Sequence, residues 1–450
     1  MYISKVDTLL ENIRKLLRRG AGRNVRNILQ KMHAADVAYL FRYLNEVEQF
    51  KIFRLLENSD MAPEIISQVD NPTGAGLLAR LDRKSAAQIL QAMDPDDEVN
   101  ILKEMDEEVK GEILSHLSDT ETENIEELFQ YPEDSAGRIM NTNCFTLHQE
   151  VTVSQAIEEL QERGEESTEM VFYVYVVDGS DHLVGVCSLR QLLMVPPNTR
   201  IQRIMTSDVV SVEPETDQEE VAEVVERYDL LAVPVVDGEK SILGIITVDD
   251  VIDVIRKEAT EDIMKMVGTG DEYLNRSIFR SARMRMPWLL AAFIGGFIGI
   301  QFLRMFNATL QQIVSLAFFL PIIMAMGGNI GITSMTIVVR GLATGRISVR
   351  ELRRVILKEL TVAVLLGVLY GSFLMLLAYI QFREVTYLGF VVGSSMFISM
   401  TMAAAIGTCA PIILNTLKID PAVATGPFVT SAVDSLGILV YLGMATLLLV

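Results

Sequence analysis

The chain has 450 residues, half of them hydrophobic and 22% charged, with a formal net charge of −20. A positive mean hydropathy beside that many charges excludes a uniform soluble protein, a nucleic-acid-binding protein and a small secreted scaffold. Residues 1–270 hold 26 basic and 52 acidic side chains, whereas residues 271–450 hold 13 basic and 7 acidic ones. These counts predict an acidic water-soluble part joined to an apolar part with few charges.

The three cysteines, Cys144, Cys187 and Cys409, lie far apart and form no CxxC pair. This spacing argues against a disulfide framework or a structural zinc site and fits a reducing compartment. The start of the chain lacks the apolar core of a signal peptide, and residues 1–270 contain no apolar run long enough to span a bilayer. We therefore expect residues 1–270 to lie in the cytosol.

Residues 1–130 are predicted to form an all-α domain of short stacked helices. Apolar residues recur with a period near 12, and four N-cap candidates share that spacing: Asp82, Asp94, Asp106 and Ser118. Regular short helices of this kind stack as a superhelical array. A solvated surface is favoured, at about two to one, for the acids that crowd the predicted loops. These acids are Asp96, Asp97, Glu98, Asp106, Glu107 and Glu108.

Residues 131–255 contain two similar α/β units of strand, helix, hairpin and helix. Asp178-Gly179 and Asp237-Gly238 mark the two hairpins. The repeat resembles the cystathionine-β-synthase (CBS) domain, which works as a tandem pair. In that family a Thr/Ser-x-x-Asp motif contacts the ribose of an adenine nucleotide, and Thr247 and Asp250 match it. The first unit has Gln191 in place of the acid, so the resemblance implies an adenine nucleotide such as ATP in the second unit.

A connecting helix is predicted next, assigned to residues 256–280, with its acidic pattern beginning at Asp249. Carboxylates three or four residues apart line one face of a helix. Like charges at that spacing repel, and divalent cations coordinated by oxygen are the simplest neutralising partner. The residues concerned are Asp249, Asp250, Asp253, Glu258, Glu261 and Asp262.

Residues 281–450 are predicted to be a transmembrane domain of five helices. A spanning helix needs about 20 apolar residues, and the long uncharged stretches of this region supply five. The expected spans are 284–306, 313–339, 356–381, 387–416 and 422–448. Eleven cations flank one side of these spans, whereas Arg304 and Arg383 flank the other. The bias predicts a cytosolic amino terminus and an extracellular or periplasmic carboxyl terminus.

Two features inside the spans predict an ion pathway. The second span carries Pro321 and the sequence Gly327-Gly328-Asn329, which favour a disrupted helix with unwound carbonyls beside protein or water. Close packing through small residues is the alternative interpretation. Asp434 lies within the fifth span, and no Lys, Arg or His lies inside the second to fifth uncharged stretches to pair with it. Intramembrane carboxylates usually face an aqueous path or a partner, so a permeating cation is the natural counter-charge.

The whole arrangement resembles the MgtE family of magnesium channels and transporters over nearly the full chain. Three segments carry the resemblance: Met326-Gly327-Gly328-Asn329 with Pro321, Thr216–Asp229, and Asp420–Gly437. The segment Thr247–Ile263 is also similar to the connecting helix of the family. One departure is visible, because Ile332 and Thr333 stand where the family often has Asn and Gln.

The resemblance implies a homodimer in the cell membrane that takes up Mg²⁺ through a pore between its subunits. Internal Mg²⁺ bound to the cytosolic acids would draw the connecting helices over this pore and close it. The implied metal ligands are Asp434, Asp217, Glu219, Asp229, Asp250, Asp253, Glu258, Asp262 and Asp97. The implied pore-lining residues are Pro321, Gly328, Asn329, Thr425 and Gly426.

The alternatives differ in what Asp434 does. A membrane metalloprotease would need HExxH, and the four histidines all lie outside the spans, so we do not expect an enzyme. A CBS-gated anion channel is disfavoured because a lone Asp repels anions. A divalent cation antiporter coupled to Na⁺ or H⁺ stays open, since Asp434 can carry a proton. No nucleic-acid partner is expected.

Overall fold

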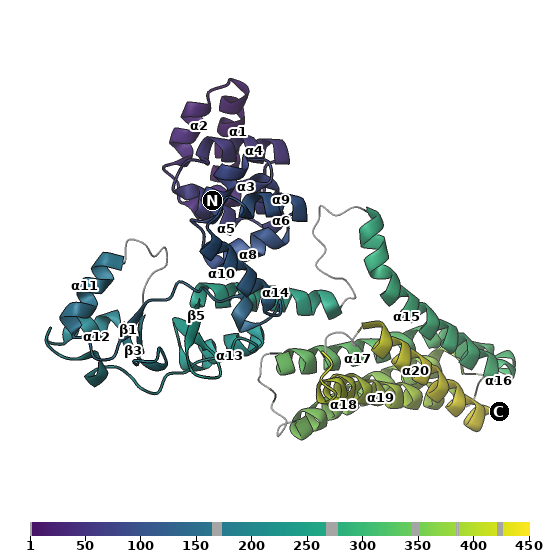
Figure 1. Cartoon of the computed structure of the whole chain (residues 1–450). Helices are drawn as coiled ribbons and strands as arrows, with labels where there is room; N and C mark the ends of the chain where they lie inside the picture. The colour runs from purple at the N-terminus through teal and green to yellow at the C-terminus, as the bar shows by residue number, and fades with distance from the viewer. Residues whose placement is uncertain are drawn as a thin grey trace. The chain divides into compact units, whose positions relative to one another are not determined.

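The computed structural model describes residues 2–163, 173–266, 278–343, 347, 352–383, 385, 387–420 and 426–450. The chain divides into two compact units, Met1–Ile255 and Arg256–Val450 (Figure 1). The predicted fold class is confirmed: an all-α amino-terminal part, an α/β part and a bundle of five long apolar helices.

The amino-terminal part of the first unit consists of short helices stacked on one another (Figure 1). Their spacing follows the capping residues: Asp82 accepts a hydrogen bond from the Ser85 N–H, and Ser118 forms a reciprocal capping box with Glu121. Asp94 and Asp106 also stand at N-cap positions. The helices are α1 (Tyr2–Arg18), α2 (Gly22–Leu29), α3 (Ala34–Phe41), α4 (Glu46–Leu56), α5 (Met61–Gln68), α6 (Asn71–Leu78), α7 (Arg83–Leu90), α8 (Pro95–Lys103), α9 (Glu107–Leu114) and α10 (Asp119–Gln130).

The α/β part forms two small sheets. In the first, β2 pairs with β1 in parallel and with β3 in antiparallel register, and in the second β4 pairs with β5 in antiparallel register. Both expected hairpins are present, although the left-handed residues are Asp181 and Lys240 rather than the glycines. The elements are η1 (Ala136–Arg138), β1 (Thr146–His148), α11 (Val153–Arg163), β2 (Tyr173–Val177), β3 (Leu183–Ser188), α12 (Leu189–Met194), η2 (Ile201–Arg203), α13 (Gln218–Tyr228), β4 (Ala232–Val236), β5 (Ile242–Thr247) and α14 (Val248–Met266).

The second α/β repeat shares a hydrophobic core with the helical part, whereas the first repeat has a core of its own. The join is close: the Asn141 N–H donates to the Ile245 carbonyl at 2.8 Å, and the Ile245 N–H donates back at 2.9 Å. A Cβ at Gly244 would lie only 2.6 Å from the Asn141 carbonyl oxygen, so this approach requires glycine. The shared core brings the start of α14 toward the helical part.

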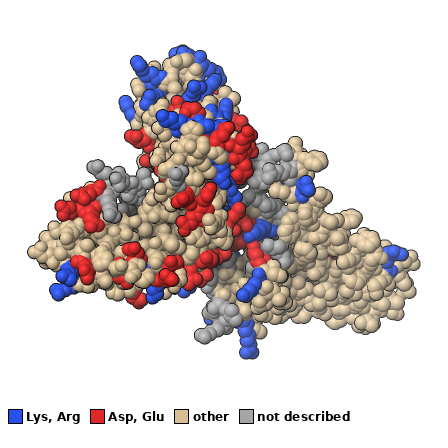
Figure 2. All heavy atoms as spheres, viewed as in Figure 1, with Lys and Arg blue, Asp and Glu red and all other residues tan. Residues whose placement is uncertain are grey.

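The second unit contains five helices that are long and apolar enough to cross a membrane. Space-filling views show charges spread over the first unit and an almost uncharged surface over these helices (Figure 2). Helix α19 packs against α17, α18 and α20, and a buried apolar core runs between them. The elements are α15 (Ile278–Met305), α16 (Asn307–Gln312), η3 (Val314–Phe318), α17 (Leu320–Ala343), α18 (Leu352–Gln381), α19 (Leu388–Thr416) and α20 (Gly426–Leu449).

The expectation of unwound backbone around Gly328 was wrong. Helix α17 is continuous from Leu320 through Ala343, so its Gly327-Gly328-Asn329 carbonyls belong to the helical ladder. Pro321 lies in the first turn, where its missing N–H leaves no intrahelical bond unmade. The irregular backbone precedes this helix instead, as η3. The alternative interpretation, close packing through small residues, describes this segment.

Candidate metal sites and ion pathway

Two groups of carboxylates meet where the helical part joins the second α/β repeat. Asp96 and Asp97 lie in the first turn of α8, and Asp250 lies in the first turn of α14. Asp96 is 5% exposed, and Asp97 and Asp250 are half-buried. The Asn141 amide donates to Asp94 Oδ1 at 3.2 Å and ties this N-cap residue to the α/β part.

The electrostatics of this acidic cluster show that its charges are poorly compensated. The pKa of Asp97 is raised to about 6, mainly by burial, while the Ser67 hydrogen bond lowers it and the nearby Asp94, Asp253 and Asp249 carboxylates add to the rise. Burial also raises the pKa of Asp250 to about 7, with Asp249 and Asp97 adding to it and the Thr247 hydrogen bond opposing it.

The neighbouring Asp96 has its pKa raised well above the usual range. Burial is the main cause, followed by the charges of Asp250, Asp97 and Asp94. Acids whose pKa values are raised in this way ionise more readily when a cation binds beside them.

The sequence interpretation of these acids as solvated was wrong for part of the set. Asp96 and Glu98 are 5% and 8% exposed, and one Glu98 carboxylate oxygen is buried without a hydrogen-bond partner. Burial, with the charge of Glu121, raises the pKa of Glu98 to about 8. The interpretation holds for Asp106, Glu107 and Glu108, which are exposed. Local sequence cannot show this difference, because burial depends on how α8 packs against helices elsewhere in the chain, such as α6 and α10.

The predicted nucleotide motif has a defined local geometry. The Thr247 hydroxyl oxygen lies 2.6 Å from both Asp249 Oδ1 and Asp250 Oδ2. In the first repeat, Ser188 instead forms a capping box with Gln191, and no acid stands there. The structure therefore keeps the asymmetry between the two repeats that the sequence predicts. Asp249 was missed as a site residue, although its neighbour Asp250 pointed to it.

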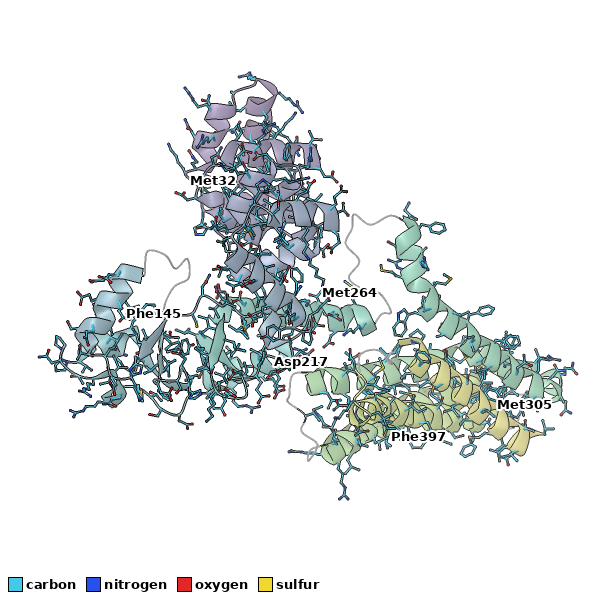
Figure 3. All side chains as sticks on the ribbon, in the orientation of Figure 1. Met32, Phe145, Asp217, Met264, Met305 and Phe397 are labelled. Carbon is cyan, nitrogen blue, oxygen red and sulfur yellow. The ribbon has the colours of Figure 1, made fainter. Side chains whose placement is uncertain are left out.

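Three of the predicted ligands lie around α13 and are not brought together into one site. Asp217 is the N-cap of α13 (Figure 3) and accepts a hydrogen bond from the Glu219 N–H at 2.9 Å. Asp229 caps the other end in a left-handed conformation, with φ of 51°. The two caps stand at opposite ends of an 11-residue helix, about 18 Å apart along its axis at 1.5 Å per residue. All three side chains are exposed.

In the second unit, the acids of α14 surround a lysine. Lys265 Nζ lies 2.8 Å from Glu261 Oε1 and 2.8 Å from Asp420 Oδ2. Burial lowers the pKa of Lys265, but the hydrogen bonds to Asp420 and Glu261 outweigh it and raise the pKa overall. The pKa of Asp262 is raised by burial and by the charge of Asp420. Glu258 lies on the same helix and adds to this repulsion.

No group of three or more His, Cys, Asp or Glu side chains is arranged closely enough to hold a metal ion among the residues that the structure describes. The acidic cluster and the α14 acids are therefore pre-assembled only in part. Carboxylates that repel one another separate until a cation draws them together, so this geometry fits a site that closes on its ligand.

Asp434 lies in α20, eight residues after Gly426, or about 12 Å along the helix. It is half-buried and forms no hydrogen bond or ion pair with the other residues that the structure describes. Its neighbours on either side, Val433 and Ser435, are buried in the bundle. Asp434 thus remains an unneutralised carboxylate at membrane depth, the arrangement expected of a cation pathway.

Small residues bring α17 close to α20. A Cβ at Gly327 or at Gly331 would lie 3.3 Å from the Val433 side chain. A Cβ at Gly437 would lie 3.0 Å from the Ser399 hydroxyl. Such close approach through glycine is the usual way in which membrane helices associate. It places the helix of Asp434 directly against the helix of the Gly-Gly-Asn motif.

The opposite face of α17 is open. A Cβ at Gly328 would meet no atom within 4 Å, and Asn329 is exposed. Pro321 is exposed near the start of the helix, and Gly426 begins α20. Thr425, the remaining predicted pore residue, lies outside the described residues. The described residues of the predicted pore thus belong to two helices that contact each other, α17 and α20.

Five spanning helices, an intramembrane carboxylate and a water-exposed part rich in facing acids define a multi-pass membrane protein of the cation-transporting class. Residues 320–444 match the divalent cation transporter (MgtE) family, residues 32–134 match the MgtE intracellular N domain, and residues 136–198 and 201–257 match CBS domains. The "Magnesium transporter MgtE" of Bacillus subtilis is 35% identical over 98% of this chain and 97% of its own length. The chain belongs to the MgtE family.

A second relative and two solved structures are also similar to this chain. The "Magnesium transporter MgtE" of Thermus thermophilus is 36% identical over 98% of this chain and 99% of its own length. The crystal structure of the soluble part of a magnesium transporter covers 56% of this chain and 99% of its own, with a TM-score of 0.52 and 33% identity. The cytosolic domain of the Mg²⁺ channel MgtE in complex with ATP covers 54% of this chain and 98% of its own, with a TM-score of 0.52 and 32% identity.

Proposed function

We propose that this protein carries Mg²⁺ across the cell membrane through a channel lined by α17 and α20. The observation that carries the proposal is Asp434, a half-buried carboxylate on a spanning helix that forms no ion pair with any described residue. Mg²⁺ is small and releases its waters reluctantly, so a pore selects it by offering oxygen atoms to the hydrated ion. Asp434 would supply the charge. Gly328, Asn329, Thr425 and Gly426 would line the same path.

The near-full-length magnesium transporters among the relatives support this assignment. In a homodimer with the pore on its axis, the open face of α17 would meet its symmetry mate and Asp434 would occur twice. The amino terminus would lie in the cytosol and the carboxyl terminus outside, as the flanking cations favour.

The function is tested by Mg²⁺ flux into proteoliposomes that contain a magnesium-sensitive dye. We expect the wild type to carry Mg²⁺ and Asp434→Asn, which keeps the shape and removes the charge, to lose at least about 90% of the flux, since removing a charge-assisted contact costs roughly 1.5–3 kcal/mol. Full selective flux in Asp434→Asn would show that the pathway lies elsewhere. Flux that requires a Na⁺ or H⁺ gradient would favour the antiporter.

We also propose that internal Mg²⁺ closes the pathway by binding at the acidic cluster and at the α14 acids. The raised pKa values of Asp97 and Asp250 support this, because burial and, to a smaller extent, neighbouring carboxylates disfavour the ionised forms, and a bound divalent cation would favour them. The proposed ligands are Asp97, Asp217, Glu219, Asp229, Asp250, Asp253, Glu258 and Asp262. With Mg²⁺ scarce the facing carboxylates separate, and with Mg²⁺ plentiful the ion bridges them. A shift from 1:99 to 99:1 needs about 5.5 kcal/mol, which several weak sites supply together.

An adenine nucleotide is proposed at the second CBS repeat, with Thr247 and Asp250 at the ribose. The relative solved with ATP supports a nucleotide of this class. Because Asp250 also belongs to the acidic cluster, nucleotide and Mg²⁺ binding would be coupled at this residue.

A further inference from the structure

A second carboxylate is buried in the spanning helices, and the pathway described above does not use it. Glu359 lies in α18 and is 7% exposed. Its Oε2 accepts a hydrogen bond of 3.0 Å from the hydroxyl of Ser334 in α17, which is 2% exposed. Glu359 is seven residues into its helix, about 10 Å along the axis. It therefore lies on the helix itself, close to the charged first turns of α18, and not in a flanking loop.

Burying a carboxylate in protein costs desolvation free energy, so its presence requires a reason. An apolar residue of similar volume would avoid the desolvation cost, and replacing buried polar pairs in this way is often neutral or stabilising. Stability alone therefore does not explain Glu359. The better-supported use of such groups is to specify one arrangement among several of similar energy.

The seam between α17 and α20 is where such a group would act. Its inward face carries Gly327 and Gly331, which approach α20 closely but present no side chains to interlock. A glycine seam allows close approach, yet it defines the rotation of a helix poorly. Ser334 lies on the same inward face, three residues beyond Gly331. Its bond to Glu359 is directional, so it can set the rotation that the glycines leave free.

The other two hydroxyls of α17 do not fix the rotation of the helix. Thr333 donates to the Asn329 and Ile330 carbonyls and Thr336 donates to the Ile332 carbonyl, all within the same helix. Ser334, in contrast, donates its hydroxyl hydrogen to a residue of another spanning helix. Fixing Ser334 also fixes Asn329, five residues earlier on the open face.

We infer that Glu359 is a positioning residue for the pathway helix: through Ser334 it holds α17 in the rotation that presents Gly328 and Asn329 to the ion. The inference rests on the proposed function. It assigns Glu359 a role through its hydrogen-bond acceptor, and it requires neither contact with the ion nor the negative charge itself.

The experiment compares Glu359→Gln, Glu359→Leu and Ser334→Ala with the wild type in proteoliposomes at equal protein. The readouts are Mg²⁺ flux and the ratio of Mg²⁺ to Ca²⁺ flux. Glutamine keeps an acceptor oxygen, so both readouts should stay within about twofold of the wild type. Glu359→Leu and Ser334→Ala remove the acceptor and the donor, so each should lower the flux ratio about tenfold, since hydrogen bonds to charged groups are the stronger class. The double variant should be no worse than either single one.

Thr361→Val is the matched control. Thr361 is exposed on the same helix, two residues from Glu359, and donates to the Leu357 carbonyl of its own helix. This variant should leave the flux ratio unchanged. A merely structural defect would shift the elution volume and lower the melting temperature without altering the ratio.

Two results would overturn the inference. Equal loss in Glu359→Gln and Glu359→Leu would mean that the charge is needed, as in an ion-binding site. Additive losses in the double variant would mean that the two residues are not coupled. If Glu359→Leu fails to fold, Ser334→Ala and Glu359→Gln still test the inference, because it predicts a lowered flux ratio for the first and an unchanged ratio for the second. Absence of Mg²⁺ flux in the wild type would count against the proposed function instead.

Discussion

Lys265 and Asp420 form an ion pair, with the lysine Nζ 2.8 Å from the carboxylate Oδ2, although 155 residues separate them in the chain. The pair joins the connecting helix α14 to the segment between α19 and α20. The same ammonium also contacts Glu261. A cation of the protein itself thus occupies part of the space between acids for which the sequence predicted a divalent ion.

Replacing Lys265 with Met should release this contact and leave Asp420 facing Glu261 and Asp262. Repulsion among these acids favours separation of α14 from the segment of Asp420. We therefore expect Mg²⁺ flux at low internal Mg²⁺ to rise about twofold to fivefold, since partly exposed ion pairs contribute up to about 1 kcal/mol. High internal Mg²⁺ should still suppress flux, because the ion can take the place of the ammonium. Arg256→Met, at an exposed position of the same helix, is the control. Reduced flux at low Mg²⁺ in Lys265→Met would contradict the account.

The acidic cluster predicts a Mg²⁺-dependent stabilisation of the first unit. Asp97→Asn with Asp250→Asn removes two facing charges, so the melting temperature of the metal-free protein should rise. The further increase produced by millimolar Mg²⁺ should shrink to less than half of the wild-type increase, since fewer ligands bind the folded state. Glu107→Gln with Glu108→Gln, at exposed positions of α9, should behave like the wild type. Undiminished stabilisation in the Asp97 and Asp250 variant would place the ion elsewhere.

The pKa shifts give a pH dependence with a definite sign. The pKa values of Asp97 and Asp250 are raised in the folded protein to about 6 and about 7. Protonation of these two acids contributes to the free energy of unfolding. This contribution is fully present below the usual carboxyl pKa near 4 and is lost as the pH rises through about 7. The metal-free protein should therefore melt at a higher temperature at pH 5.5 than at pH 8, by differential scanning fluorimetry. Mg²⁺ should stabilise it more at pH 8, where protons do not compete. The opposite order would show that these acids are not paired with one another.

Nucleotide binding should depend on the second CBS repeat alone. Thr247→Val removes the hydroxyl between Asp249 and Asp250 and should weaken ATP binding about tenfold or more in calorimetry, which is the loss expected for one hydrogen bond to a charged group. Gln191→Ala in the first repeat is the matched control and should leave the affinity unchanged. Equal weakening by both variants would contradict the asymmetry between the repeats.

Much of the fold could be predicted from local patterns. The capping residues Asp82 and Ser118 and the apolar periods mark the short helices, and the length of the uncharged runs gives the spanning helices. These features depend on residues within one or two turns of each other, so a sequence shows them directly.

The errors arose where distant segments meet. Asp96 is 5% exposed although it lies in an acidic first turn, and the pairing of Glu359 with Ser334 joins residues 25 positions apart on two helices. The glycines of α17 suggested a disrupted helix, whereas they serve close packing against Val433. Helix propensity is a weak guide in the membrane, because unpaired backbone groups are costly there and the helix keeps its hydrogen bonds even at glycine.

Single-channel recording from membranes containing the wild type and Asp434→Asn, with internal Mg²⁺ varied, tests the central claim most directly. The account predicts unitary currents carried by Mg²⁺ in the wild type, a falling open probability as internal Mg²⁺ rises, and no Mg²⁺ current in Asp434→Asn. Magnesium transport without unitary steps, or unitary Mg²⁺ currents of full size in Asp434→Asn, would contradict it.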